Sequence, residues 1–205
     1  MKHTMKALKT MCEWAAAQNH DASWGYQQIL DRTDWSGPRR DAPEPKSANL
    51  ADTYFKQTVD LAGDNPLGDL ARALYEEREQ IEWFTMYQSY HDEPRVKGLG
   101  SNYIILRLGG PRASWHADDL TTAVTIQGPN TWYPPHAHRQ KEVYGIMGGV
   151  AEWQRGAEGW VERESGEIIY HPSGVRHETQ TRDEPLLSFA SWIDHFHLPS
   201  VFVWE

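Results

Sequence analysis

Apolar residues recur every three to four positions over roughly the first ninety residues, a period typical of helices that bury one face. Met5, Leu8, Met11, Cys12 and Ala15 fall on one face of a predicted helix, and Leu67, Leu70, Ala71, Leu74 and Tyr75 on one face of a second. Asn65-Pro66 marks the start of the second helix, because asparagine caps helices and proline suits the first position. Residues 36–45 hold three prolines and a glycine and are expected to form a loop or linker.

After Gly98 the period changes to two, which is typical of strands with one buried face. Eight short runs are expected as strands: Tyr103–Leu108, Thr121–Gln127, Glu142–Met147, Val150–Gln154, Trp160–Glu162, Glu167–Tyr170, His177–Thr181 and Leu186–Trp192. Short strands at this spacing favour a sandwich or closed barrel. We therefore predict a mainly-β protein, with a helical region (residues 1–97) packed on a barrel (residues 98–205). We do not expect the helices to form an independent domain.

The most informative stretch is YPPHAHRQKEVY, residues 133–144. Side chains two positions apart in an extended segment point to the same side. His136 and His138 therefore share a face, and Glu142 shares a face with Tyr144. A carboxylate that points into a small barrel is costly unless a positive group pairs with it. A divalent cation is the simplest such partner, so the pattern indicates a metal site.

A second stretch, GEIIYHPSGVRH, ends at His177. Its Pro-x-Gly turn ends one strand and directs this histidine back toward the barrel axis. Three imidazoles and one carboxylate form a mixed nitrogen and oxygen donor set, which suits zinc, iron(II), manganese or nickel better than calcium or magnesium. His171, just before the turn, is expected to face outward, because its neighbour Tyr170 would take the other face.

These spacings resemble the two motifs of the cupins. Residues 136–149 match H-x-H-x3-E-x6-G, and residues 166–177 match G-x5-P-x-G-x2-H, with a short gap as in compact bacterial cupins. The glycine that should precede the first histidine does not match, and Thr181 stands where the second motif has a non-ligand asparagine. The resemblance implies a double-stranded β-helix, or jelly-roll, barrel. The implied metal ligands are His136, His138, Glu142 and His177.

Two tyrosines make the resemblance more specific. Tyr144 lies two residues beyond Glu142, and Tyr133 precedes the histidines. A phenol beside a divalent cation can lose its proton well below its usual pKa of about 10, because the cation stabilises the phenolate. Together with the four ligands, these tyrosines resemble the cupin dimethylsulfoniopropionate (DMSP) lyases, with the branch (Q-like, L-like or another) left open. The motif resemblance covers about residues 130–192, under a third of the chain.

The lyase resemblance implies a β-elimination that converts DMSP into dimethyl sulfide and acrylate. Tyr144, as tyrosinate, would remove the α-proton while the substrate carboxylate binds the metal, and Tyr133 supplies a second phenol at the site mouth. The sulfonium would rest on aromatic faces, for which the candidates are Trp132, Trp153 and Trp192. The implied cofactor is one divalent transition metal (zinc, iron(II) or manganese), and the implied partner is a small zwitterionic substrate.

Other interpretations stay open on the sequence alone. An iron-dependent cupin dioxygenase acting on a small molecule would use the same four ligands but would not need a base at Tyr144. A non-catalytic cupin that binds a small molecule would tolerate the loss of that phenol. Tyr144 could also be an inward barrel tyrosine with its hydroxyl hydrogen-bonded, on a barrel whose metal site is inactive.

Charge and composition narrow the classes of partner. The formal net charge of −9 and the absence of a Lys/Arg cluster argue against nucleic acid. Cys12 is the only cysteine, so no internal disulfide is possible, which fits a reducing cytoplasm. No apolar run has the length of a membrane span or the form of a secretory signal. Edge strands and the N-terminal extension are compatible with a homodimer.

Overall fold

The computed structural model describes residues 1–37, 49–85, 93–111 and 113–204. Its helices are α1 (Lys2–Ala16), α2 (Ser23–Arg32), α3 (Asn49–Asp60), α4 (Pro66–Glu76) and α5 (Lys97–Asn102), with a 3₁₀ turn at Arg78–Gln80. The two predicted helices are α1 and α4, and the Asn65 side chain caps α4 by accepting hydrogen bonds from backbone N–H groups. Most of the predicted loop at 36–45 lies outside the described residues. None of the helices in the described ranges combines the length and hydrophobicity that crossing a membrane requires.

The strands form two antiparallel sheets. The first contains, in order, β1 (Phe84–Thr85), β2 (Tyr103–Gly109), β3 (Leu120–Gln127), β10 (Leu186–Ile193), β5 (Lys141–Gly148) and β8 (Ile168–His171). The second contains β11 (Val201–Phe202), β4 (Trp132–Ala137), β9 (His177–Thr181), β6 (Ala151–Arg155) and β7 (Val161–Arg163). The eight predicted strands are present. Among the described residues β1, β4 and β11 were not predicted: β1 and β11 are too short to show a periodicity, and β4 contains the adjacent prolines Pro134 and Pro135, which are unusual within a strand.

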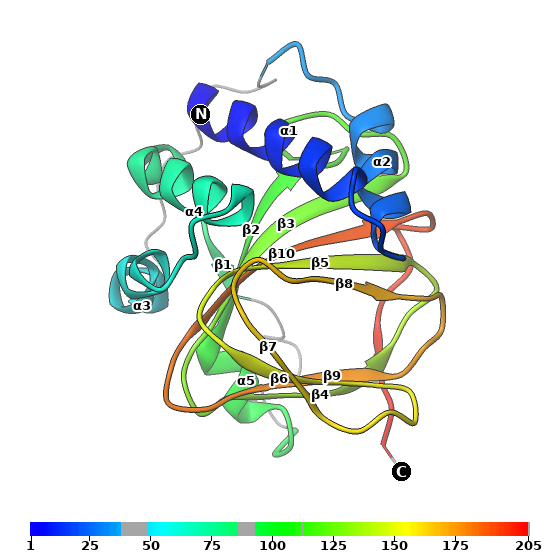
Figure 1. Ribbon diagram of the computed structural model, residues 1–205. Helices are drawn as coiled ribbons and strands as arrows, with labels where there is room; N and C mark the ends of the chain where they lie inside the picture. The colour runs from blue at the N-terminus through cyan, green and yellow to red at the C-terminus, as the bar shows by residue number, and fades with distance from the viewer. Residues whose placement is uncertain (38–48, 86–92, 112, 205) are drawn as a thin grey trace.

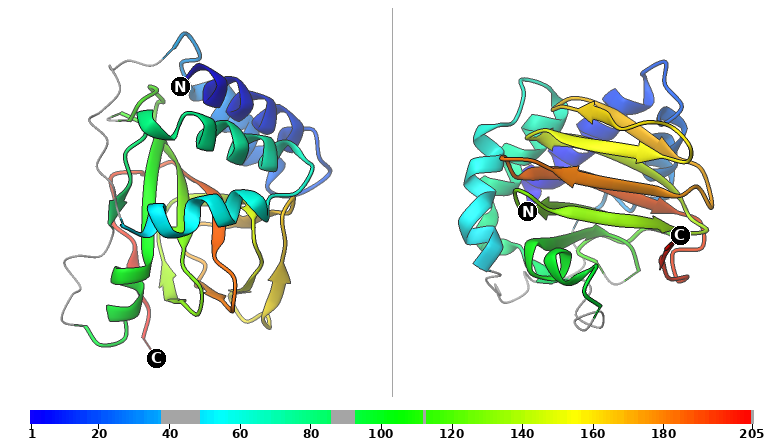
Figure 2. Two further views of the ribbon diagram at one scale, coloured as in Figure 1. Left: turned by 90° about the vertical axis from the view of Figure 1, so that its left-hand side faces the viewer. Right: turned by 90° about the horizontal axis from the view of Figure 1, so that it is seen from below.

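The two sheets face each other as the walls of a barrel, and helices α1–α4 cover the outer face of the six-stranded sheet (Figures 1 and 2). The alternation along β5 separates two cores. Val143 and Met147 point to the helices and join the large core there. Tyr144 and Ile146 point into the barrel and pack in a smaller cluster with Trp153. The division of the chain at residue 97 stays a prediction.

Glycines let the helical layer rest directly on the backbone of β5. A Cβ at Gly145 would lie 2.4 Å from Cδ2 of Leu67, and a Cβ at Gly148 would lie 2.1 Å from the backbone oxygen of Thr58. Both distances are shorter than any van der Waals contact. At Gly148 the obstacle is backbone, so only glycine fits, whereas at Gly145 the Leu67 side chain would have to move. The strand that carries Glu142 and Tyr144 is therefore held in place by close contact with α3 and α4.

The substitution Gly148→Ala should destabilise the protein by about 2 kcal/mol or more, because the new methyl must displace backbone rather than a flexible side chain. Urea unfolding at neutral pH measures this change. The matched control is Gly159→Ala, since nothing lies within 4 Å of a Cβ there. Equal stability of the two variants would contradict the close approach of α3 to β5.

The N-terminus of α1 is capped from a distance by Glu77, which follows α4. Its carboxylate accepts hydrogen bonds from the backbone N–H of His3 (3.3 Å) and of Thr4 (3.0 Å), and from Thr4 Oγ1 (2.7 Å). Burial alone would raise the pKa of Glu77, but the hydrogen bonds from Thr4 outweigh it and lower that pKa to about 2. The first helix is thereby tied to the fourth.

Because the pKa of Glu77 is lowered in the folded protein, its contribution to stability is complete above pH 4.5 and is lost as the pH falls toward about 2. Glu77→Gln should therefore cost about 1 kcal/mol at pH 7 and progressively less below pH 4.5. Urea titrations at several pH values would measure this. Glu76→Gln serves as the control, because the Glu76 side chain is 68% exposed. A loss that did not change with pH would contradict the capping role.

Candidate metal centre

Strands of both sheets direct polar side chains to one buried point inside the barrel. His136 lies on β4, Glu142 on β5 and His177 on β9, while His138 follows directly after β4. His136 and His177 are register partners, so their side chains emerge side by side. Each of the four residues is at most 6% exposed. The structure thus brings the four predicted ligands together from two separate stretches of the chain.

The donor atoms of this cluster have the spacing of ligands around one ion. Glu142 Oε2 lies 3.0 Å from His138 Nε2 and 3.1 Å from His177 Nε2. The rings of His136 and His177 have centroids 4.1 Å apart. Ligands about 2.1 Å from a tetrahedral zinc lie about 3.4 Å from one another, so the two distances from Glu142 Oε2 suit ligands of one cation. The donor atoms of His136, His138 and His177 also lie within 4.8 Å of one another.

Two atoms of the cluster lack partners and indicate what the site can bind. Glu142 Oε1 and His177 Nε2 are buried and accept or donate no hydrogen bond within the described part of the chain. Such atoms cost about 1–3 kcal/mol each when unsatisfied. A cation would satisfy both, since a carboxylate oxygen and a neutral imidazole nitrogen are lone-pair donors. This buried His/Glu cluster could hold a metal ion.

The backbone sets the tautomer of all three imidazoles. Nδ1 of His136 lies 2.9 Å from the Pro134 carbonyl, Nδ1 of His138 lies 3.1 Å from the Gln140 carbonyl, and Nδ1 of His177 lies 3.0 Å from the Val175 carbonyl. A carbonyl can only accept, so each Nδ1 carries a proton, and Nε2 is the ring atom whose lone pair can bind an ion at the centre. Such support is typical of histidines that bind metals.

The charges of the cluster are strongly coupled. Burial alone would raise the pKa of Glu142, but His138 and the hydrogen bonds around the carboxylate hold that pKa well below its usual range. Burial alone would lower the pKa of His138, but the Glu142 carboxylate outweighs it and raises that pKa. Burial and the neighbouring His177 lower the pKa of His136 well below its usual value. The Glu142 carboxylate and the protonated form of His138 therefore stabilise each other.

The expectation that His171 faces outward is wrong. This histidine is 1% exposed, and its Nδ1 lies 3.4 Å from Glu142 Oε2. Burial, and next the neighbouring His177, lower the pKa of His171 to about 4. The error concerned which residues of β8 point into the barrel. The sequence of residues 167–170 does not decide this, because Ile168 and Ile169 are both apolar and either could face inward. In the structure Ile169, rather than Tyr170, shares the inner face with His171.

Tyr144 and Trp153 lie on the inner face of the barrel next to this histidine. Tyr144 is 3% exposed, and its ring lies 5.6 Å from that of His171 and 4.7 Å from that of Trp153 between centroids. Its register partner on β8 is Ile169, two positions along the ladder from the pairing of Glu142 with His171. The structure thus places the predicted base in the same interior as the carboxylate, beside His171.

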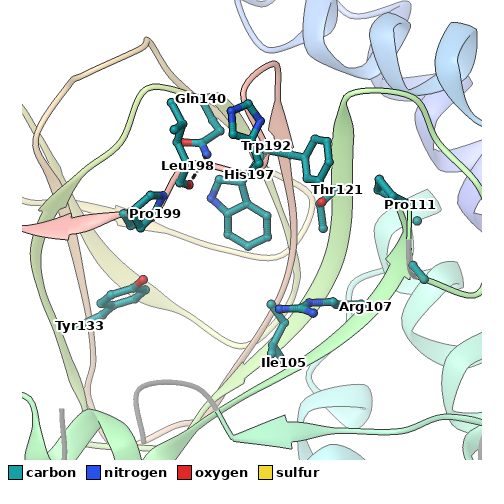
Figure 3. A pocket seen from close by; sticks show the side chains of 15 residues that line it. Ile105, Arg107, Pro111, Thr121, Tyr133, Gln140, Trp192, His197, Leu198 and Pro199 are labelled. Atoms are coloured by element: carbon teal, nitrogen blue, oxygen red, sulfur yellow. Dashed lines mark hydrogen bonds between the residues drawn. The ribbon is translucent and has the colours of Figure 1, made fainter. Parts of the chain in front are cut away.

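Tyr133 and Trp192 line a pocket of about 690 Å³ at one end of the barrel. A bulge in β4 between Tyr133 and His136 lets these two residues share a face, and their rings stack with centroids 4.2 Å apart. Figure 3 shows the Tyr133 hydroxyl pointing into this pocket, with Arg107 of the facing sheet on another wall. Tyr133 therefore lies between the pocket and the buried cluster.

Trp132 does not join this group. The residue is 40% exposed, and its Nε1 donates a hydrogen bond to Glu178 on the outer face of β9.

Two hydrogen bonds that hold the loop of His138 in place were not predicted. Gln140 Nε2 donates to the carbonyls of His195 and Leu198, which ties the His138 loop to the chain after β10. No motif signals such a tie, because it joins residues 55 or more positions apart.

Thr181 shows how the chain tolerates its departure from the second motif. Its Oγ1 donates to the Gly128 carbonyl (2.6 Å) and accepts from the Thr131 backbone N–H (3.0 Å). The threonine therefore fastens the turn that leads into β4. The glycine that begins the first motif, and that does not match in this sequence, would lie in the same turn.

Comparisons with known proteins show the family of the chain. A family model described as dimethylsulfoniopropionate lyase matches residues 25–188. The DMSP lyase DddQ of Ruegeria pomeroyi is 36% identical over 113 residues, which are 54% of this chain and 54% of that relative. The chain thus aligns with about half the length of this curated relative.

Solved structures show the same fold. The crystal structure of DddQ from Ruegeria pomeroyi superposes with a TM-score of 0.76 at 20% identity, over 98% of this chain and 96% of that one. A chain from the crystal structures of the DMSP lyases RdDddP and RnDddQII gives a TM-score of 0.71 at 20% identity, over 98% of this chain and 100% of that one. At this identity the likeness concerns the fold alone. It confirms the predicted mainly-β cupin barrel with a helical N-terminal region.

Metal binding should release protons, because the Glu142 carboxylate favours the protonated form of His138, and that proton must leave Nε2 before the ring can bind an ion. The pKa of His138 is raised, so affinity should fall as the pH drops below that raised value, where the proton competes with the ion. Glu142→Gln removes both a ligand and the cause of the raised pKa. We expect its metal affinity to fall by about 100-fold or more, with less proton release. Calorimetric titration of zinc in two buffers of different ionisation enthalpy measures both quantities.

The matched control for this titration is Glu178→Gln. Glu178 is also buried and lies next to His177, but it faces the other side of β9 and pairs with Arg176. Its variant should bind zinc as the parent protein does. Equal loss of affinity in both variants would show that the effect is a general disturbance of β9 rather than the removal of a ligand.

Proposed function

Because this chain belongs to the dimethylsulfoniopropionate lyase family, we propose that it is a metal-dependent carbon–sulfur lyase that converts DMSP into dimethyl sulfide and acrylate. The observation that supports this best is the buried cluster of three imidazoles and one carboxylate, with a tyrosine on the same inner surface. A reaction that removes a proton from carbon needs a strong base and a nearby positive charge. This interior offers residues for both.

We propose His136, His138, Glu142 and His177 as the ligands of one divalent transition metal, with zinc, iron(II) and manganese as candidates. The three Nε2 atoms are oriented for such an ion by the backbone carbonyls that hold the Nδ1 atoms, and the Glu142 carboxylate faces them. When bound, the ion supplies positive charge that holds the substrate carboxylate and stabilises the negative charge that develops beside it. The buried setting strengthens this attraction, because little water screens it.

Tyr144 is the proposed base. As a phenolate it would take the proton from the carbon next to the substrate carboxylate. The electrons of that C–H bond then form the C=C bond of acrylate, and the C–S bond breaks with its electron pair remaining on sulfur. Neutral dimethyl sulfide departs, so the leaving group requires no acid. The 3% exposure of Tyr144 keeps bulk water from competing for the proton.

The cationic sulfonium would lie against the aromatic walls of the pocket. Tyr133 and Trp192 line the pocket itself, and the buried Trp153 packs behind Tyr144. A cation over an aromatic face gains about 0.5–2 kcal/mol. Arg107 on another wall repels a cation, which favours the aromatic side. Trp132 lies outside this pocket, so Tyr133 and Trp192 are the proposed contacts for the sulfonium.

Tyr144→Phe removes the proposed base and leaves the ring in place. Dimethyl sulfide released from DMSP by the metal-loaded protein should fall about 100-fold or more, with metal content unchanged. Headspace gas chromatography gives the rate, and elemental analysis gives the metal content. Release of dimethyl sulfide at the parent rate by this variant would remove Tyr144 as the base.

The matched control is Tyr75→Phe, in which the same hydroxyl is lost from a ring that packs against Phe55 in the helical layer. It should release dimethyl sulfide at the parent rate. The assay is run with and without oxygen, and release should persist in both atmospheres. A requirement for oxygen would instead favour the dioxygenase interpretation.

Cytoplasmic location and a homodimer remain predictions of the sequence.

A further inference from the structure

We infer that His171 is a fifth protein donor of the metal centre, so that the ion is held by two overlapping sets of ligands that share His177. The inference extends the proposed metal centre and rests on it, but it does not depend on the identity of the substrate. His171 belongs to neither cupin motif as a ligand, because it occupies the variable position before Pro172.

The pairing of β5 with β8 places His171 directly opposite Glu142. The two residues are register partners in an antiparallel ladder, so their side chains leave the sheet on the same face and meet. Both are almost completely buried. Nδ1 of His171 lies 3.4 Å from Glu142 Oε2, and its ring lies 4.0 Å from the ring of His177 between centroids.

Distances around the carboxylate do not distinguish His171 from the expected ligands. Oε2 of Glu142 has nitrogen atoms at 3.0 Å, 3.1 Å and 3.4 Å, and these belong to His138, His177 and His171. Ligands of one zinc ion lie about 3.4 Å apart, so all three separations suit a common cation. The donor atoms of Glu142, His171 and His177 lie within 4.8 Å of one another, as do those of His136, His138 and His177.

The hydrogen-bonding of His171 also differs from that of the other three histidines. Among the described residues no backbone carbonyl accepts from its Nδ1, which faces the Glu142 carboxylate instead. Its Nε2 is buried and has no partner within the described residues. The tautomer of His171 is therefore not set by the backbone: Nδ1 donates to the carboxylate when no ion is bound, and an ion that replaces this proton would receive the Nδ1 lone pair beside Oε2.

Five protein donors exceed the four of a tetrahedral zinc site. A centre of four nitrogens and one carboxylate suits ions that accept five or six ligands, such as iron(II), manganese(II) or cobalt(II). Without His171, the remaining four donors would favour a tetrahedral ion. We therefore attribute the metal preference of the site to His171, which a description with four ligands omits.

Cobalt(II) titration of the metal-free protein tests this directly, because four-coordinate cobalt(II) absorbs visible light more strongly than five-coordinate cobalt(II). His171→Phe removes the donor and leaves no room for a replacing water. We expect it to bind cobalt(II) about tenfold to a hundredfold more weakly, with a more intense visible spectrum. His171→Asn, which keeps a polar atom near the Nδ1 position, should show a smaller change in both. It also covers the case in which the Phe variant does not fold.

The control is His3→Asn, since the His3 side chain on α1 is 75% exposed and remote from the barrel interior. It should match the parent spectrum and affinity. Weaker binding by both His171 variants with an unchanged spectrum would overturn direct ligation and make His171 a positioning residue for Glu142. Unchanged affinity would overturn both roles.

The outcomes separate this inference from the proposed function. If the parent protein binds no cobalt(II), the proposed metal centre and the role of His171 fall together. If the spectrum changes as expected but DMSP yields no dimethyl sulfide, the ligand role of His171 stands and the lyase activity does not.

Discussion

The carboxylate of Glu142 has no exposed surface, and the rest of the barrel interior is organised around it. A buried negative charge is unfavourable by several kcal/mol unless positive charge and hydrogen bonds surround it. Here three imidazoles approach one of its oxygens within 3.4 Å. They come from β8, β9 and the turn after β4, so one charge joins both walls of the barrel. A buried carboxylate surrounded by imidazole nitrogens is unfavourable without a positive charge among them. The same arrangement therefore favours the binding of a cation.

The helical layer acts on this site through β5. Along that strand alternate residues serve two purposes: Val143 and Met147 pack under the helices, while Glu142 and Tyr144 face the interior. Gly145 and Gly148 allow the helices to touch the backbone itself. Because protein interiors are closely packed, the position of such a strand is well defined. The N-terminal helices therefore contribute to the chemistry without supplying a ligand.

The site and the pocket are linked by an irregularity in β4. A regular strand would turn Tyr133 and His136 to opposite faces, since they are three positions apart. The bulge between them brings both to one face and stacks their rings. Bulges commonly redirect side chains next to active sites. The phenol of Tyr133 can thus contact a molecule in the pocket while its ring supports a residue of the buried cluster.

Much of this protein could be predicted from its sequence, because local spacing carries the information. The change of period near Gly98 indicated helices followed by a barrel, and the pairs at i and i+2 indicated which side chains share a face. Spacing within one strand could not show which residues of β8 face inward, because two adjacent isoleucines hide the alternation. It also could not predict the bulge in β4. Those features depend on which strands pair and in what register. Only the tertiary structure decided that His171 meets Glu142, because that contact forms across a ladder between residues 29 positions apart.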